Sequence, residues 1–104
     1  KNKLKVESLS KYPRVQRDIS IIIDDEINFE QIKNTTKQCA PILISSIELF
    51  DEYKGKGIPS GKKSYALSIS LIDKSKTLTE KIIEKTISKI IKKLIEKFGA
   101  TLRK

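Results

Sequence analysis

Histidine is absent from this chain of 104 residues, and cysteine occurs only once, at Cys39. The lack of histidine removes the commonest general base and the commonest metal ligand of proteins. A single cysteine excludes an internal disulfide, and its ordinary role in such a sequence is that of a small, buried apolar residue. We therefore expect no catalytic residue, no metal site and no cofactor in this chain.

Long apolar runs are also missing. No segment approaches the roughly 20 apolar residues that a membrane span needs, and no signal-peptide pattern opens the chain. The sequence begins with Lys1 rather than Met, so we expect it to be a piece of a longer protein. Together with the single cysteine, these features favour the cytoplasm and give no reason to expect a membrane partner.

Negative charge is scarce, because 13 acidic residues face 22 basic ones and the net charge is +9 at pH 7. Such a surplus in a small domain indicates a polyanionic partner, nucleic acid first and an anionic membrane second. Most of the basic residues are lysines. The three arginines, Arg14, Arg17 and Arg103, are the more informative ones, since a planar guanidinium can read bases and phosphates in ways that lysine cannot.

Six elements of secondary structure follow from the pattern of the chain. The first helix is expected to begin after the N-cap Asn28 and to end before Pro41. The second is expected to begin after Thr77 or Thr79 and to end at Gly99. The expected strands cover residues 17–24, 42–53, 62–73 and 100–103, and the expected helices cover 28–39 and 79–98. The third strand alternates cleanly, with apolar residues on one face and small residues, mostly serines, on the other.

The order β-α-β-β-α-β is that of the ferredoxin-like sandwich, an α+β fold. Two right-handed crossovers place both helices on one face of a four-stranded antiparallel sheet with strand order 4-1-3-2. Residues 1–15 lack a clear period and are expected to form an extended lead-in. Residues 16–104 are expected to form the domain.

Three of the four glycines lie in one loop, within "DEYKGKGIPSGKKS" at residues 51–64. We expect strands one and three to run parallel, with strands two and four opposite to them, so that the start of strands one and three meets the ends of strands two and four at one edge of the sheet. All three arginines then converge on this loop. The loop would let backbone approach RNA, and its lysines would bind phosphates: Lys54, Lys56, Lys62 and Lys63. The alternative is a long hairpin connection whose glycines merely permit positive φ.

Two tyrosines flank the loop. Tyr65 is in phase with the apolar residues of its strand and is expected to be buried. Strict alternation would place Tyr53 with the core residues of its own strand, but a loop rim among charges suits a ring that stacks on a base. Asp51 is placed to accept hydrogen bonds from a base edge. The serines of strand three, with Ser20 on strand one, would leave room for bases, although an ordinary solvated face shows the same pattern.

Four segments of the chain resemble the C-terminal anticodon-binding domain of bacterial phenylalanyl-tRNA synthetase beta subunits. They are "KYPRVQRDISIII", "LFDEYKGKGIPSGKKSYALSISL", "TLTEK" and "FGATLR", and the resemblance covers about residues 11–103. Domains of this family have a ferredoxin-like fold and grip the anticodon stem-loop of phenylalanine tRNA. The synthetase is an (αβ)₂ heterotetramer, whose alpha subunit carries out aminoacylation with ATP and Mg²⁺.

The resemblance also implies roles for particular residues. The family's tyrosine that matches Tyr53 stacks on the first anticodon base, and the residues that match Asp51 and Ser64 hydrogen-bond it. The arginine that matches Arg103 and the backbone near Ser20 lie by the other anticodon bases. The full set of expected RNA contacts adds three basic residues, Lys62, Lys63 and Arg17.

Two other functions remain open for this fold, because fold does not determine function. A regulatory module that binds a small molecule would bind an amino acid tightly and be indifferent to RNA. A domain that serves mainly for packing between subunits would contact RNA too weakly to measure in isolation.

Overall fold

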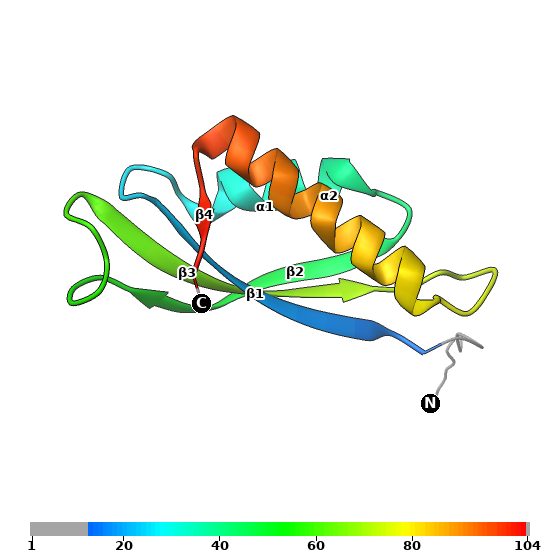
Figure 1. Ribbon diagram of the computed structural model, residues 1–104. Helices are drawn as coiled ribbons and strands as arrows, with labels where there is room; N and C mark the ends of the chain where they lie inside the picture. The colour runs from blue at the N-terminus through cyan, green and yellow to red at the C-terminus, as the bar shows by residue number, and fades with distance from the viewer. Residues whose placement is uncertain (1–12, 104) are drawn as a thin grey trace, which may run out of the picture.

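The computed structural model describes residues 13–103 and shows a sheet with both helices on one face (Figure 1). The elements in chain order are β1 (Val15–Asp24), α1 (Phe29–Cys39), β2 (Ile44–Tyr53), β3 (Lys62–Leu71), α2 (Glu80–Phe98) and β4 (Thr101–Leu102). The strand order is β2-β3-β1-β4, and every neighbouring pair is antiparallel. The predicted ferredoxin-like fold is confirmed. Of the expected lead-in, residues 1–12 lie outside the described residues, and Val15 already belongs to β1.

The helices end where their capping residues predict. The Asn28 side chain accepts a hydrogen bond from the Gln31 N–H at 2.9 Å, and the Gln31 side chain accepts one from the Asn28 N–H at 3.0 Å. This reciprocal pair is a capping box, which satisfies two free donors at the start of α1. Thr79 caps α2, accepting from the Ile82 N–H at 3.2 Å. Gly99 ends α2 with φ 67°, a left-handed conformation that glycine adopts without a steric cost.

The core lies between the sheet and the two helices. Alternate residues of the central strands point into it, and α1 and α2 cover them with one apolar stripe each. The largest fully buried aliphatic side chains are Ile21, Ile23, Ile32, Leu67, Ile69, Leu71, Ile90 and Leu94. Each such side chain contributes about 1.5–3 kcal/mol by leaving water. Tyr65 and Cys39 are buried as predicted.

The direction of the strands corrects one prediction. β1 and β3 are antiparallel, with Asp24 opposite Lys62 and Val15 opposite Leu71. The right-handed crossover through α1 makes β1 parallel to β2, and β3, which lies between them, pairs antiparallel with both. The assumption that strands one and three run parallel is therefore wrong. Arg17, near the start of β1, lies at the end of the sheet away from the glycine loop, and the three arginines do not converge.

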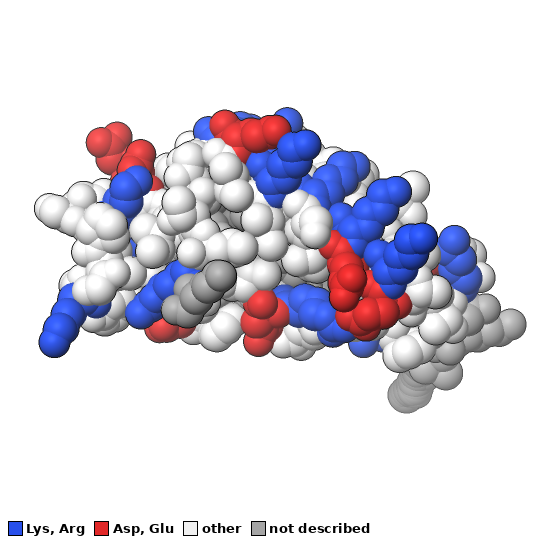
Figure 2. Space-filling model, in the orientation of Figure 1, with Lys and Arg blue, Asp and Glu red and all other residues white. Residues whose placement is uncertain are grey.

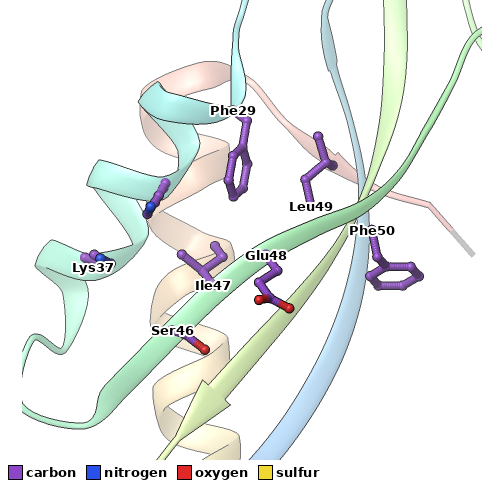
Figure 3. Close-up of a pocket in the computed structure, with 8 residues that line it drawn as sticks. Phe29, Lys37, Ser46, Ile47, Glu48, Leu49 and Phe50 are labelled. Atoms are coloured by element: carbon purple, nitrogen blue, oxygen red, sulfur yellow. The ribbon is translucent and has the colours of Figure 1, made fainter.

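A β-bulge in β2 decides which face Tyr53 occupies. The register shifts between Leu49 and Asp51, so that Phe50 is an extra residue without a partner on β3. Figure 3 shows Leu49 on the helix side of β2 and Phe50 on the other side. An extra residue reverses the phase of alternation beyond it. Tyr53 is consequently opposite Ser64, on the helix-free face, rather than with the core residues of its strand.

Candidate nucleic-acid interface

The helix-free face of the sheet brings together side chains of β1, β2 and β3 and that of Arg103, which directly follows β4. Two cross-strand rows run over it, Asp51–Ala66–Ser20 and Tyr53–Ser64–Ile22. The Arg103 N–H donates to the Ser20 carbonyl at 2.9 Å, which continues the β4 pairing by one residue. Five of the predicted RNA-binding residues are therefore neighbours on one face: Asp51, Tyr53, Ser64, Ser20 and Arg103.

Arg103 links the rows through its side chain. Its guanidinium carbon lies 5.2 Å from the centroid of the Tyr53 ring, within the range of a cation–π contact. Its Nη1 donates a hydrogen bond to the Ser64 Oγ at 3.2 Å. Because β3 carries only Ser64 and Ala66 here, the long arginine side chain can cross from the edge strand toward β2. The Tyr53 residue is 37% exposed, so part of the ring remains available to another planar group.

The glycine loop holds the hydroxyl end of the same tyrosine. The Tyr53 Oη donates to the Lys56 carbonyl at 3.0 Å. Gly55 has φ 128°, and a Cβ at this position would lie 3.4 Å from the Tyr53 Oη. A residue with a side chain would be strained at this positive φ, and its Cβ would touch the tyrosine at van der Waals distance. Glycine at position 55 is required for the backbone to turn this closely around the ring.

An acidic turn lies against the glycine loop and pairs with two of its lysines. Asp24 accepts from the Lys62 Nζ at 2.9 Å, and Asp25 lies 2.7 Å from the Lys54 Nζ. The hydrogen bond from Lys54 lowers the pKa of Asp25, and the same contact raises the pKa of Lys54. Both pairs are exposed and contribute little to stability. These contacts were not predicted from the sequence, because they follow from the antiparallel pairing of β1 with β3.

Two of the predicted residues lie apart from this face. Lys63 is in phase with Tyr65 on the helix side and is buried, with its Nζ 4.8 Å from the Tyr65 ring centroid and 4.0 Å from the Glu52 carboxylate. Arg17 lies at the far end of the sheet, where its Nη2 is 3.2 Å from the Glu80 carboxylate. Lys62 lies at the rim of the face, two residues before Ser64 on β3 and opposite Asp24 of β1.

The sequence pattern of the ferredoxin-fold anticodon binding domain family matches residues 10–103. The chain belongs to this family. It is 42% identical, over 97% of its length, to the phenylalanine–tRNA ligase beta subunit of Porphyromonas gingivalis, and 43% identical, over 95%, to that of Clostridium acetobutylicum. The chain spans about 12% of the length of each of these relatives.

Other features of residues 13–103 bear on function more weakly. No helix in this range is long and apolar enough to cross a membrane. The same residues contain no group of three or more Cys, Asp or Glu side chains placed to hold a metal ion. An open groove of about 660 Å³ runs between α1 and β2, lined on its charged sides by Lys33, Lys37 and Glu48 (Figure 3). A small regulatory ligand could enter this groove.

Proposed function

We propose that this domain binds the anticodon stem-loop of phenylalanine tRNA on the helix-free face of its sheet, as an accessory part of a phenylalanine–tRNA ligase beta subunit. Family membership and the names of the relatives support the class of partner. The observation that carries the location is the placement of Tyr53, an exposed aromatic ring beside Ser64 and Arg103 on the same face. An exposed ring among hydrogen-bonding groups is the usual platform for an unstacked RNA base.

Each group on this face has a distinct part in recognition. The Tyr53 ring stacks on the first anticodon base, which contributes about 1–3 kcal/mol. The exposed Asp51 carboxylate, one row away, accepts hydrogen bonds from the N–H groups on the Watson–Crick edge of a guanine. Ser64 and Arg103 supply further hydrogen bonds, and the backbone at Ser20 lies by the neighbouring bases.

Lysines of the glycine loop supply the salt-dependent part of the affinity. Lys56 and Lys62 lie near the face and can approach phosphates. Lys62 is paired with Asp24 in the free domain, so that a phosphate would replace a carboxylate as its partner. Aminoacylation itself, with its ATP and Mg²⁺, is assigned to the alpha subunit of an (αβ)₂ synthetase. The contribution of this domain is to position the tRNA.

The test is the affinity of the chain for a phenylalanine anticodon hairpin, measured by fluorescence anisotropy at about 50 and 200 mM salt. Tyr53→Ala is expected to weaken binding about tenfold, since loss of stacking removes on the order of 1.4 kcal/mol. Tyr53→Phe keeps the ring and should bind nearly as well as the wild type. Ile42→Ala, which changes a residue that is 89% exposed before β2 begins, is the control for surface changes elsewhere.

A second arm tests the base that is read. Replacing the guanine at the first anticodon position by inosine removes one N–H donor group, and the wild-type chain should bind this hairpin more weakly. Asp51→Asn should bind both hairpins alike. Equal binding of Tyr53→Ala and wild type would refute the stacking role. Absence of RNA binding at low salt, with tight binding of an amino acid by calorimetry, would favour the regulatory alternative.

A further inference from the structure

Helix α2 carries an unusual ladder of positive charge. Five lysines follow one another at intervals of four residues, at positions 81, 85, 89, 93 and 97. Residues four apart are neighbours on a helix surface, about 6 Å apart along the axis at 1.5 Å per residue. Like charges at this spacing destabilise a helix. Repulsion within the ladder therefore lowers the stability of α2, and a bound polyanion would remove this repulsion.

Acidic side chains of α2 neutralise the ladder only in part. Glu80 is paired with Arg17 of β1, and Glu84 and Glu96 are the two other carboxylates on a helix that carries six lysines. None of the ion pairs found within residues 13–103 involves a lysine of α2. Figure 2 shows a row of basic side chains over α2 at the molecular surface. The helix therefore keeps an exposed surplus of positive charge.

The middle of the ladder opens onto a groove between the two helices. The groove has a volume of about 430 Å³, and α2 lines it with Lys89, Lys92, Lys93 and Glu96. Gln38 and Cys39 line it from α1. All three lysines are exposed, and no aromatic side chain lines the groove. Its chemistry suits phosphate groups rather than bases, because it offers ammonium groups and no surface for stacking.

We propose that the groove between α1 and α2 binds the phosphodiester backbone of RNA, as a second surface on the side of the domain opposite to the anticodon site. Lys89 and Lys93, four residues apart, are neighbours on the helix surface, and Lys92 adds a third ammonium group to the same groove. Three ammonium groups at one groove without an aromatic neighbour favour adjacent phosphates of an RNA strand as the occupant. Binding at the groove does not depend on base sequence, so the groove can contact the phosphates of a stem or of another part of the RNA.

The probe is an RNA hairpin with a perfect duplex stem and a loop unrelated to any anticodon, and the protein is the full 104-residue chain. Lys89→Gln/Lys93→Gln removes two charges at the groove. Lys74→Gln/Lys76→Gln removes two charges from exposed lysines of the β3–α2 loop and is the matched control. The groove variant should bind about fivefold more weakly at low salt and lose about one to two units from the slope of log K against log salt. The control should change affinity less than twofold.

Other outcomes separate this proposal from the anticodon site and from its competitors. Tyr53→Ala should leave duplex binding unchanged, so failure of the anticodon proposal would not affect this one. Equal losses in the two double variants would mean that only net charge matters, which overturns the groove. Stronger competition by polyglutamate of equal charge than by the duplex would assign the groove to an acidic protein surface and also overturn it. The Tm of the groove variant should not fall, because the substitutions relieve repulsion along α2.

Discussion

The guanidinium carbon of Arg103 lies 5.2 Å from the centroid of the Tyr53 ring, so the side chain that follows the edge strand β4 meets a side chain of the opposite edge strand β2 across the sheet. The same guanidinium donates to the Ser64 Oγ. The ring is thereby held between the arginine and the glycine loop before any RNA is bound. Pre-ordering of this kind lowers the entropy that binding costs.

Two replacements of Arg103 should separate the contribution of its charge to RNA affinity from that of its planar shape. Arg103→Ala is expected to weaken binding of the anticodon hairpin about two- to fivefold, since an exposed cation–π contact contributes about 0.5–1 kcal/mol. Arg103→Lys keeps the charge and should show the wild-type salt dependence, yet it should still bind more weakly because it lacks the planar fork. Anisotropy titrations at several salt concentrations measure both effects. Full recovery of affinity by lysine would show that only the charge matters.

Gly55 and Gly57 provide a matched pair for the loop. Both have positive φ, but only at Gly55 would a Cβ contact the Tyr53 Oη, at 3.4 Å. Alanine at either position should cost about 1 kcal/mol of stability through backbone strain. Gly55→Ala should in addition weaken RNA binding, because relaxation of the strained backbone would shift the loop segment whose Lys56 carbonyl holds the Tyr53 hydroxyl. Thermal unfolding and hairpin affinity of the two variants separate the effects. Equal RNA affinities would show that the loop does not position the tyrosine.

Thr36 is a buried residue whose hydroxyl has no hydrogen-bond partner within the described part of the chain. Thr36→Val keeps the shape and removes the unsatisfied hydroxyl, so it should raise the free energy of unfolding by about 1 kcal/mol. Thr86, also buried, donates from its hydroxyl to the Ile82 carbonyl at 2.8 Å. Thr86→Val should therefore lower the stability by about 0.5–1 kcal/mol. Urea unfolding of the two variants checks this contrast, and shifts of the same sign would contradict it.

The ion pair between Lys54 and Asp25 should be visible in a pH titration. The hydrogen bond from Lys54 holds the pKa of Asp25 below its ordinary value of about 3.9. The pair's contribution to stability is present above the unfolded pKa and is lost as the pH falls through the lower, folded pKa. Lys54→Gln should raise the pKa of Asp25 toward its ordinary value, as measured from its carboxyl carbon shift by NMR. The pKa of Asp73, which hydrogen bonds from Ser75 hold low, should stay unchanged in this variant.

Local signals in the sequence predicted most of the fold. Asn28, Thr79 and Gly99 mark helix ends through side-chain or glycine chemistry that acts within one turn, and the alternation of β3 identifies its two faces. Such features depend on residues close together in the chain. They survive folding because no tertiary contact opposes them.

The candidate site was less predictable because it depends on contacts between distant segments. The sequence prediction had strands one and three parallel, which would have brought all three arginines together. Because β1 and β3 are antiparallel, Arg17 lies at the other end of the sheet. The bulge at Phe50 has no local signature in the sequence, yet it puts Tyr53 and Asp51 on the helix-free face. Lys63, which lies beside a residue of the site in the sequence, points the other way because neighbouring strand residues alternate.

The most direct test of the anticodon site is a search for intermolecular NOEs between the Tyr53 ring protons and the bound hairpin. We expect NOEs from this ring to the first anticodon base, and amide shift changes at Asp51 and Ser64. Tyr65, buried in the core, should give none. Amide shift changes confined to α1 and α2, with a Tyr53 ring free of contacts to the RNA, would contradict the proposal that the helix-free face reads the anticodon.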